Sequence, residues 1–208
     1  MRERRVRAYI GLGANVGDAR TTLTEAVRAL RALPGVRLRG VSRLYVTAPV
    51  GVTDQPEFHN AVVALDVPAG PDPATGALSL LGALKELERQ SGRQERRRWG
   101  PRELDLDLLI FGRARISVER PPGARSNDAE TDPAKASKLL VVPHAEAQKR
   151  LFVLAPLADL APGLVPPGWS ETVATARDRR ELVEGAESVR PISGWDGLTG
   201  ASGLPLGP

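Results

Sequence analysis

The sequence predicts an α+β fold, an antiparallel β-sheet with two helices packed on one of its faces. The first observation is the order of hydrophobic periods along the chain, which alternate between strand and helix patterns as β-α-β-β-α-β. The second is that glycine or proline stands between most of these segments, where turns are needed. The third is size, since 208 residues, 41% of them apolar, suffice for one domain with a substantial core. This element order is that of a ferredoxin-like sandwich.

The first strand and the first helix are predicted from the N-terminal part of the chain. Residues 5–12 are rich in Val, Tyr and Ile and predict a strand. Residues 11–18 have the sequence GLGANVGD, which predicts a glycine-rich turn. Asp18 is a suitable N-cap for the helix that follows, whose apolar residues recur at helical spacing, and Pro34 and Gly35 end that helix.

Two strands come next in the pattern. Residues 36–46 alternate between apolar and polar, with a change of phase near Gly40 that predicts a strand with a β-bulge. Residues 47–57 contain two prolines and predict a loop, and residues 58–66 predict the next strand.

The second helix and the fourth strand complete the pattern. A leucine stripe at helical spacing predicts the helix, which Gly92 ends. Residues 93–102 form an arginine-rich loop, and residues 104–111 are the most strand-like segment of the chain. The stripe consists of Leu78, Leu81, Leu84 and Leu87.

The rest of the chain is less regular. Residues 120–138 carry three prolines, a glycine and small polar residues, which predicts a mobile surface insertion. Residues 151–160 are apolar and fit either a returning strand or a helix. We expect a single domain over residues 1–176 and a disordered tail over residues 177–208, where the chain becomes charged and then rich in glycine and proline.

Composition excludes several classes of protein. The chain has no cysteine and two histidines, His59 and His144, so disulfides and thiolate metal sites are excluded and a histidine-rich zinc site is not expected. No apolar run approaches the roughly 18 residues that span a bilayer, and the basic N-terminus lacks the apolar stretch of a signal peptide. We therefore expect a cytoplasmic protein. Its net charge of +4 suits a polyanionic partner such as a nucleotide, a nucleic acid or a membrane surface.

Asp105 and Asp107 are the strongest chemical signal in the sequence. At i and i+2 in an apolar strand, both side chains leave one face, while Leu104, Leu106 and Leu108 leave the other. Two carboxylates about 6.6 Å apart repel each other by about 2.5 kcal/mol at an effective dielectric constant near 20. Magnesium would relieve this repulsion, because it binds one or two carboxylates together with water and substrate phosphates. The alternative is an edge strand whose polar face is hydrated.

Five arginines immediately before this strand strengthen the case for phosphoryl transfer. Metal ions neutralise phosphate oxygens in such reactions, and arginines stabilise the charge that spreads in the transition state. The alternatives are a hydrated basic loop and a nucleic-acid-binding patch. By contrast, the glycine-rich turn lacks the Gly-Lys-Ser/Thr ending of a phosphate-binding loop, and a lone loop histidine such as His144 is usually only exposed. The arginines are Arg93, Arg96, Arg97, Arg98 and Arg102.

Four blocks of this sequence resemble, in order and spacing, the 6-hydroxymethyl-7,8-dihydropterin pyrophosphokinase family. The most specific block is RWGPRELDLDLLIFG at residues 98–112. The others lie at residues 9–18, 45–60 and 142–152, and the resemblance covers roughly residues 5–165. It implies a ferredoxin-like enzyme of folate biosynthesis that transfers pyrophosphate from ATP to the hydroxymethyl group of a reduced pterin and releases AMP.

The resemblance also implies how the substrates are bound. Two magnesium ions would bridge the ATP phosphates and be held by Asp105 and Asp107, and Asp107 would also polarise or deprotonate the substrate hydroxyl. The pterin would stack between Phe58 and Phe152, and Asn60 would read its polar edge. Stacking suits a flat heterocycle, although on residue type alone the two rings would be assigned to the core. Backbone around Thr47 and Val50 would complete the pterin site.

On the nucleotide side, the resemblance assigns a larger set of residues. Trp99 would belong to a loop that closes over the pterin, and Arg98 and Arg102 would contact substrate and phosphates. His144 would donate to a phosphate oxygen near the leaving AMP. The residues expected to bind ATP are Glu88, Arg93, Arg98, His144 and Arg150. The expected partners are ATP and the pterin, with no nucleic acid or membrane, and the enzyme is expected to be a monomer.

Some positions depart from the family pattern. Ala14 stands where a serine is common, which removes a hydroxyl contact, and Ala48 replaces the first proline of a usual pair. The stretch between Gly92 and Trp99 is about one residue short, so the middle arginine role is left open between Arg96 and Arg97.

Two other functions fit part of the pattern. A ferredoxin-like RNA-binding domain would suit the basic charge, but it stacks bases on sheet aromatics, and this chain has 4% aromatic residues. A nucleotidyltransferase also uses strand aspartates and two metal ions. The order of Phe58, Asn60 and Phe152 favours the pterin enzyme over both.

Overall fold

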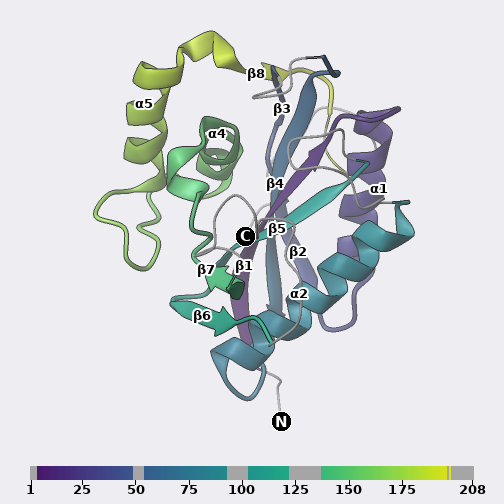
Figure 1. The fold of residues 1–208 in the computed structure, drawn as a ribbon, viewed down its shortest axis with the longest axis vertical. Helices are drawn as coiled ribbons and strands as arrows, with labels where there is room; N and C mark the ends of the chain where they lie inside the picture. The colour runs from purple at the N-terminus through teal and green to yellow at the C-terminus, as the bar shows by residue number, and fades with distance from the viewer. Residues whose placement is uncertain (1–3, 49–53, 93–102, 122–136, 196, 198–208) are drawn as a thin grey trace.

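A six-stranded antiparallel sheet with helices on both faces forms the centre of the molecule (Figure 1). The computed structural model describes residues 4–48, 54–92, 103–121, 137–195 and 197. The strand order is β5-β1-β4-β3-β8, and β2 also pairs with β4. The elements are β1 (Arg5–Ala14), α1 (Ala19–Ala32), β2 (Arg37–Val41), β3 (Leu44–Thr47), β4 (Phe58–Pro68), α2 (Pro73–Gln90), β5 (Asp105–Phe111), β6 (Ile116–Glu119), β7 (Lys138–Val142), η1 (Ala147–Lys149), α4 (Leu151–Leu160), α5 (Val173–Glu184), η2 (Ala186–Ser188) and β8 (Val189–Ile192).

The predicted β-α-β-β-α-β order is confirmed, and so are several local features. The Asp18 side chain accepts a hydrogen bond from the backbone N–H of Thr21 and caps α1. The pairing of β2 with β4 shifts register between Leu38 and Gly40, where the bulge was expected. The strand predicted over residues 36–46 is divided in two, because β2 ends at Val41 and β3 begins at Leu44.

The glycine-rich segment differs from its prediction. Residues 11–14 continue β1, and Gly11 and Gly13 lie within the strand and pair with both neighbouring strands. Long-range pairing with β4 and β5 provides the hydrogen bonds that a turn would otherwise satisfy locally, so the turn is confined to the few residues before α1.

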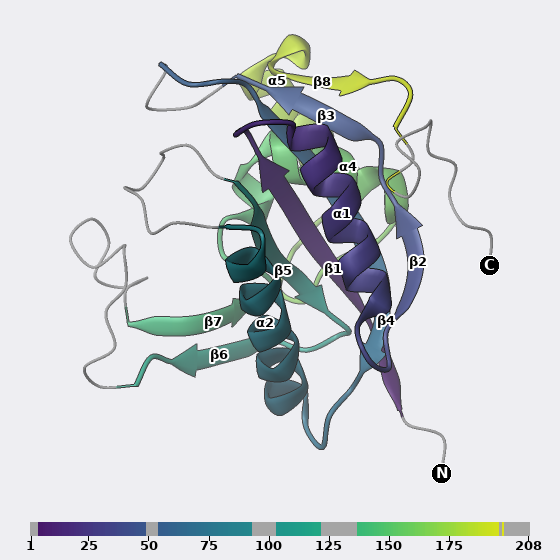
Figure 2. The same cartoon turned by 90° about the vertical axis from the view of Figure 1, so that its right-hand side faces the viewer.

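Two hydrophobic cores hold the layers together. The larger core lies between the sheet and helices α1 and α2, which Figure 2 shows in front of the sheet. It includes Leu23 and Leu30 of α1, Leu84 of α2 and Leu65 of β4. The smaller core lies on the opposite face, where Leu154, like other residues of α4, packs against β1, β4 and β5.

The C-terminal part of the chain is ordered further than predicted. Residues 151–160 form helix α4, which settles the alternative between strand and helix. The prediction of disorder from residue 177 is wrong for the described residues. Helix α5 is capped by Thr172, β8 pairs with β3, and Trp195 is 1% exposed. The burial of Trp195 and the pairing of β8 with β3 are long-range contacts that stabilise this segment, and local sequence patterns do not predict them.

The ends of the predicted insertion form a hairpin. Strands β6 and β7 pair with each other, and the backbone N–H of Arg120 donates to the carbonyl of Ser137 at 2.7 Å. Residues 122–136 lie outside the described residues, so the prediction for them stays a prediction. Within the described ranges, no helix is both long enough and apolar enough to cross a bilayer.

Candidate active site

Asp105 and Asp107 lie on the sheet face against which α4 packs. Leu106 and Leu108 belong to the core beneath α1 and α2, so strand alternation places the two aspartates on the other face, as predicted. The strand is an edge strand, as the alternative interpretation required. Both aspartates are nevertheless half-buried, which does not fit a fully hydrated polar face.

Two glycines of β1 lie beside these aspartates. Gly11 pairs with Asp107, and Gly13 pairs with Asp105 on one side and with Asn60 on the other. A Cβ atom at position 13 would lie 3.4 Å from Asn60 Oδ1 and 4.0 Å from the Cβ of Asp105. Adjacent strands are about 4.8 Å apart, so the backbones of Asp105 and Asn60 face each other across about 10 Å. The glycine between them leaves this floor flat.

Asn60 is held in one orientation by the neighbouring strand. It is 7% exposed, and its Nδ2 donates to Thr47 Oγ1 at 2.9 Å. Its Oδ1 faces the Gly13 side, as the distance from a Cβ at that position indicates. The site therefore offers a fixed carbonyl oxygen, which can accept a hydrogen bond from an N–H group of a flat ligand lying on the glycine floor.

A polar cluster joins α4 to the strand that carries Thr47. Asp159 of α4 accepts hydrogen bonds from the Tyr45 hydroxyl at 3.0 Å, from Arg43 Nη2 at 2.7 Å and from the backbone N–H of Arg43 at 3.0 Å. Burial, together with the nearby Asp159 charge, raises the pKa of Tyr45, so its hydroxyl remains a donor. This cluster fixes the helix that carries Phe152.

The two predicted stacking rings come from different elements. Phe58 begins β4 and Phe152 lies in the first turn of α4, and both are half-buried. Phe152 packs against a small cluster that includes Tyr45 and Leu151. The guanidinium carbon of Arg150 lies 5.8 Å from the centroid of the Phe152 ring, within the range of a cation–π contact. A residue predicted for the nucleotide thus contacts one predicted for the pterin.

His144 is held next to β5 by two backbone contacts. Its N–H donates to the carbonyl of Leu109 at 2.9 Å, and its Nδ1 accepts from the N–H of Glu146 at 3.3 Å. When the imidazole is neutral, its proton is then on Nε2. That nitrogen can donate to an anionic oxygen, the role expected from the sequence.

Glu88 has a backbone partner that the sequence did not predict. It is expected among the ATP-binding residues, which stays a prediction, and in the structure it is 2% exposed and lies against β5. Its Oε1 accepts from the backbone N–H of Leu106 at 2.8 Å and from Lys85 Nζ at 2.7 Å. The structure therefore joins Glu88 to the backbone of the aspartate strand.

Asn15 is a site-region residue that the sequence reasoning missed. It is 2% exposed, and its Nδ2 donates to Gln55 Oε1 and to the carbonyl of Pro56, each at 3.1 Å. It fixes the segment that leads into Phe58 and Asn60. The signal available in the sequence was an amide side chain directly after a strand of glycines, a position where Asn often bonds to backbone.

Several predicted site residues lie outside the described ranges. These are Val50, Arg93, Arg98, Trp99 and Arg102, with Arg96 and Arg97 of the same loop.

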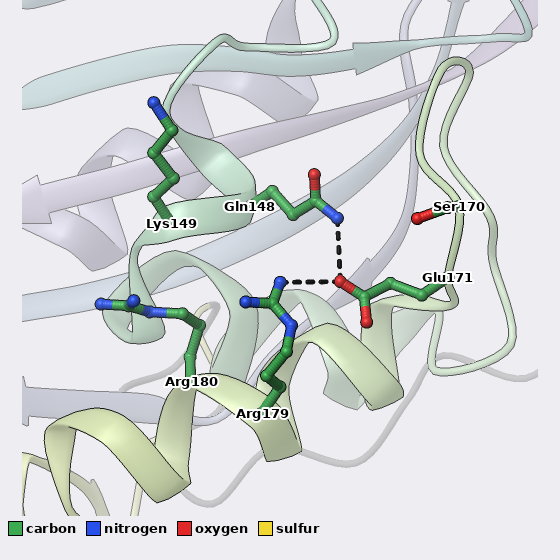
Figure 3. A pocket seen from close by; sticks show the side chains of 6 residues that line it. All are labelled: Gln148, Lys149, Ser170, Glu171, Arg179 and Arg180. Atoms are coloured by element: carbon green, nitrogen blue, oxygen red, sulfur yellow. Dashed lines mark hydrogen bonds and ion pairs between the residues drawn. The ribbon is translucent and has the colours of Figure 1, made fainter.

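A separate hollow of about 370 Å³ lies between η1 and α5 (Figure 3). Its charges are paired, since Glu171 accepts from Gln148 at 2.9 Å and from Arg179 at 2.7 Å. The Arg179 hydrogen bond lowers the pKa of Glu171. Arg180 is paired with Glu184, and none of the predicted site residues lines this hollow.

Within the described ranges, no group of three or more His, Asp or Glu side chains is arranged to hold a metal ion. The aspartates of β5 supply two carboxylates. A pair of this kind suits magnesium, which completes its coordination with water and substrate phosphates and needs no all-protein cage.

Comparison with known proteins gives a consistent result. The family model for 7,8-dihydro-6-hydroxymethylpterin-pyrophosphokinase matches residues 9–162. The 2-amino-4-hydroxy-6-hydroxymethyldihydropteridine pyrophosphokinase of Pseudomonas aeruginosa is 42% identical over 195 residues, which cover 94% of this chain and 98% of the relative. The enzyme of the same name from Bacillus subtilis is 38% identical over 153 residues, which cover 74% of this chain and 77% of the relative.

Solved structures show the same fold. The Plasmodium falciparum HPPK-DHPS triple mutant with STZ-DHP superposes with a TM-score of 0.69 and 15% identity, covering 93% of this chain and 48% of the solved chain. This chain therefore spans about half the length of that protein.

Proposed function

The chain belongs to the 7,8-dihydro-6-hydroxymethylpterin-pyrophosphokinase family, and we infer that it transfers pyrophosphate from ATP to the hydroxymethyl group of 6-hydroxymethyl-7,8-dihydropterin. The products are the pterin diphosphate and AMP, and the reaction is a step of folate biosynthesis. The observation that carries this conclusion is family membership over most of the chain, together with a flat glycine floor between a carboxylate pair and a fixed amide.

We propose that the two substrates meet over β1. The pterin lies on the side of Asn60, whose Oδ1 accepts from a ring N–H group, and Phe58 and Phe152 stack on the ring. Thr47 supports this arrangement, because it holds the amide of Asn60. Val50 and Trp99 complete the pterin site by the family resemblance.

We propose that the triphosphate lies on the side of the aspartates. Asp105 and Asp107 hold the magnesium ions, which neutralise phosphate oxygens when bound there. His144 donates from Nε2 to a phosphate oxygen, and its two backbone contacts support that orientation. By the family resemblance, Arg150 binds the nucleotide from the α4 side, and Arg93, Arg98 and Arg102 contact substrate and phosphates.

In the transfer step, the hydroxymethyl oxygen attacks the β-phosphorus of ATP. A new phosphorus–oxygen bond forms, and the bond from the β-phosphorus to the oxygen that bridges it to the α-phosphorus breaks. That electron pair leaves with AMP. We propose that Asp107 accepts the hydroxyl proton, and strand alternation, which puts Asp107 on the site face, supports this role. Positioning over a flat floor lowers the entropic cost of bringing the two substrates together.

Nucleotide analysis tests the proposed function. The chain is mixed with ATP, magnesium and 6-hydroxymethyl-7,8-dihydropterin, and the products are separated by chromatography. AMP that forms only when the pterin is present is the expected result. ADP would indicate transfer of a single phosphoryl group, and pyrophosphate with no pterin diphosphate would indicate nucleotidyl transfer.

We also propose that the enzyme acts as a monomer in the cytoplasm, with ATP and the reduced pterin as its partners. The need for ATP supports this compartment. Light scattering after size-exclusion chromatography tests the first point, since a monomer of 22.2 kDa is expected. Cell fractionation with an antibody against the chain tests the second.

A further inference from the structure

The strand that carries the two aspartates is an edge strand of the main sheet. Among the described residues, β5 stands at the end of the main sheet and pairs there with β1. Leu106 lies opposite Leu12 in that pairing. In an antiparallel ladder, alternate residues direct their N–H groups away from the partner strand. The Leu106 N–H is one of these, because it donates to a side chain of α2.

The acceptor of this bond is the carboxylate of Glu88, near the C-terminal end of α2. The 2.8 Å distance from Leu106 N to Glu88 Oε1 is that of a charge-assisted hydrogen bond. The same oxygen accepts from Lys85 Nζ at 2.7 Å, one helical turn earlier. Lys85 is half-exposed, whereas Glu88 is 2% exposed. A carboxylate buried to this extent needs hydrogen-bond partners of this kind.

The position of this bond along the strand connects it with the active site. The Leu106 peptide lies between Asp105 and Asp107, so its orientation sets the direction of both neighbouring side chains. The Leu106 side chain is buried in the core beneath α2 and is 0% exposed. One end of the residue is thus held by the core, and its N–H is held by Glu88.

We propose that Glu88 is a positioning residue that fixes the Leu106 peptide and thereby aims the carboxylates of Asp105 and Asp107 at the triphosphate. It acts through the backbone of β5 and does not itself bind the nucleotide. The inference rests on the proposed function for its catalytic consequence. The contact between Glu88 and Leu106 is independent of any substrate.

Three variants on one helix test this inference. Glu88→Ala removes the acceptor, and Glu88→Gln keeps a neutral acceptor oxygen of nearly the same shape. Glu86→Ala is the matched control, because Glu86 is 47% exposed and pairs with Arg89 on the outer face of the same helix. Two quantities are measured for each variant: the hydrogen-exchange rate of the Leu106 amide without substrates, and kcat with the KM for ATP.

The expected result separates positioning from direct binding. In Glu88→Ala, the Leu106 amide exchanges at least about tenfold faster and kcat falls about ten- to a hundredfold, the scale of a small misplacement of catalytic groups, while the KM for ATP changes less than kcat. Glu88→Gln restores most of the protection and most of kcat. Glu86→Ala changes neither quantity.

Two results would overturn the inference. Glu88→Ala with unchanged Leu106 exchange and unchanged kcat would show that the contact does not position the strand. A large rise in the KM for ATP in both Glu88 variants, with Leu106 still protected, would make Glu88 a nucleotide ligand. If Glu88→Ala does not fold, Glu88→Gln decides the question. A kcat and a Leu106 exchange rate that match those of the Glu86→Ala control support the inference. Loss of kcat together with loss of Leu106 protection overturns it, because the inference expects a neutral acceptor oxygen to restore both. A wild-type chain that forms no AMP would contradict the proposed function. The Leu106 exchange rates would still show whether Glu88 holds the Leu106 N–H.

Discussion

Beside the carboxylates of β5, β1 presents the backbone of Gly11 and Gly13. Any side chain at position 13 would extend between Asp105 and Asn60, where a Cβ already comes within 3.4 Å of the Asn60 amide oxygen. The absence of side chains here allows a flat ligand to approach the backbone closely. The two ends of the site are polar, and the space between them is set by glycine.

Replacement of Asp107 by Ala is expected to abolish turnover without unfolding the chain. The side chain is half-buried on the site face and lies outside both hydrophobic cores, so its loss removes a proposed metal ligand and proton acceptor more than it removes packing. Pterin-dependent AMP formation and circular dichroism are the measurements. A variant that keeps more than a tenth of the wild-type rate would contradict the assignment of Asp107 as a metal ligand.

His59 is expected to make stability depend on pH. Burial lowers its pKa in the folded chain, and its Nδ1 has no hydrogen-bond partner among the described residues. Unfolding releases the ring to water, where its pKa is about 6.5. The unfolded state therefore binds the extra proton first, and stability falls as pH drops from about 7 through the lower folded-state pKa.

Urea unfolding between pH 5 and pH 8 measures this effect. His59→Leu is expected to remove part of the loss of unfolding free energy below pH 7, and His144→Ala is expected to retain it. The two variants together test both histidines of the chain. Equal pH profiles for His59→Leu and the wild type would show that His59 does not titrate differently on folding.

At the scale of elements, the C-terminal segment completes the sheet. β8 pairs with β3, and Val189 lies opposite Thr47, the residue that holds Asn60. Beyond β8, Trp195 enters the core beneath α1, and its Nε1 donates to Thr24 Oγ1 at 2.9 Å. Arg20 of α1 donates to the carbonyl of Gly194. The segment therefore ties the β3 side of the site to α1.

Trp195→Ala is expected to lower the unfolding free energy by about 3–5 kcal/mol, the usual cost of removing a large buried aromatic side chain. It also leaves the buried Thr24 hydroxyl without this donor. Denaturant unfolding of the variant measures the loss. Leu182→Ala is the control, because Leu182 is 89% exposed on α5, and its unfolding free energy should match that of the wild type. A loss below about 1 kcal/mol for Trp195→Ala would show that the segment is not anchored there.

At the scale of the whole molecule, the sheet is covered on both faces, and the proposed site lies on the face of α4. The core beneath α1 and α2 is the larger, and the opposite face combines the smaller core with the polar residues of the site. α4 is fixed to this face by Asp159 through Tyr45 and Arg43. The β6–β7 hairpin lies beside β5, where the backbone of His144 bonds to Leu109.

Shortening this hairpin is expected to leave activity nearly unchanged. Residues 122–136 are replaced by Asn-Gly, a two-residue turn suited to a hairpin, because Arg120 and Ser137 are already hydrogen-bonded at the stem. The expected kcat is within about threefold of the wild type, since the deleted sequence has no large apolar side chain to anchor it against the site. Steady-state kinetics check this. A large loss of kcat would mean that the insertion takes part in catalysis.

Local patterns determined much of this protein. The strand and helix periods, the Asp18 cap and the orientation of Asp105 and Asp107 all follow from residues a few positions apart. Their physical basis is short-range, because side chains alternate along a strand and an N-cap bonds to the next turn of the helix. The family resemblance, with four ordered blocks, identified the function that the comparisons support.

Only the tertiary structure decided which distant residues meet. Gly13 lies between Asp105 and Asn60 because three strands pair in one register, and Glu88 reaches Leu106 because α2 packs against β5. The sequence did not predict the contact of Glu88 with Leu106 or the order of the C-terminal segment for the same reason. Pairing across the sheet and burial in a shared core depend on residues far apart in the chain, and local periodicity does not predict such contacts.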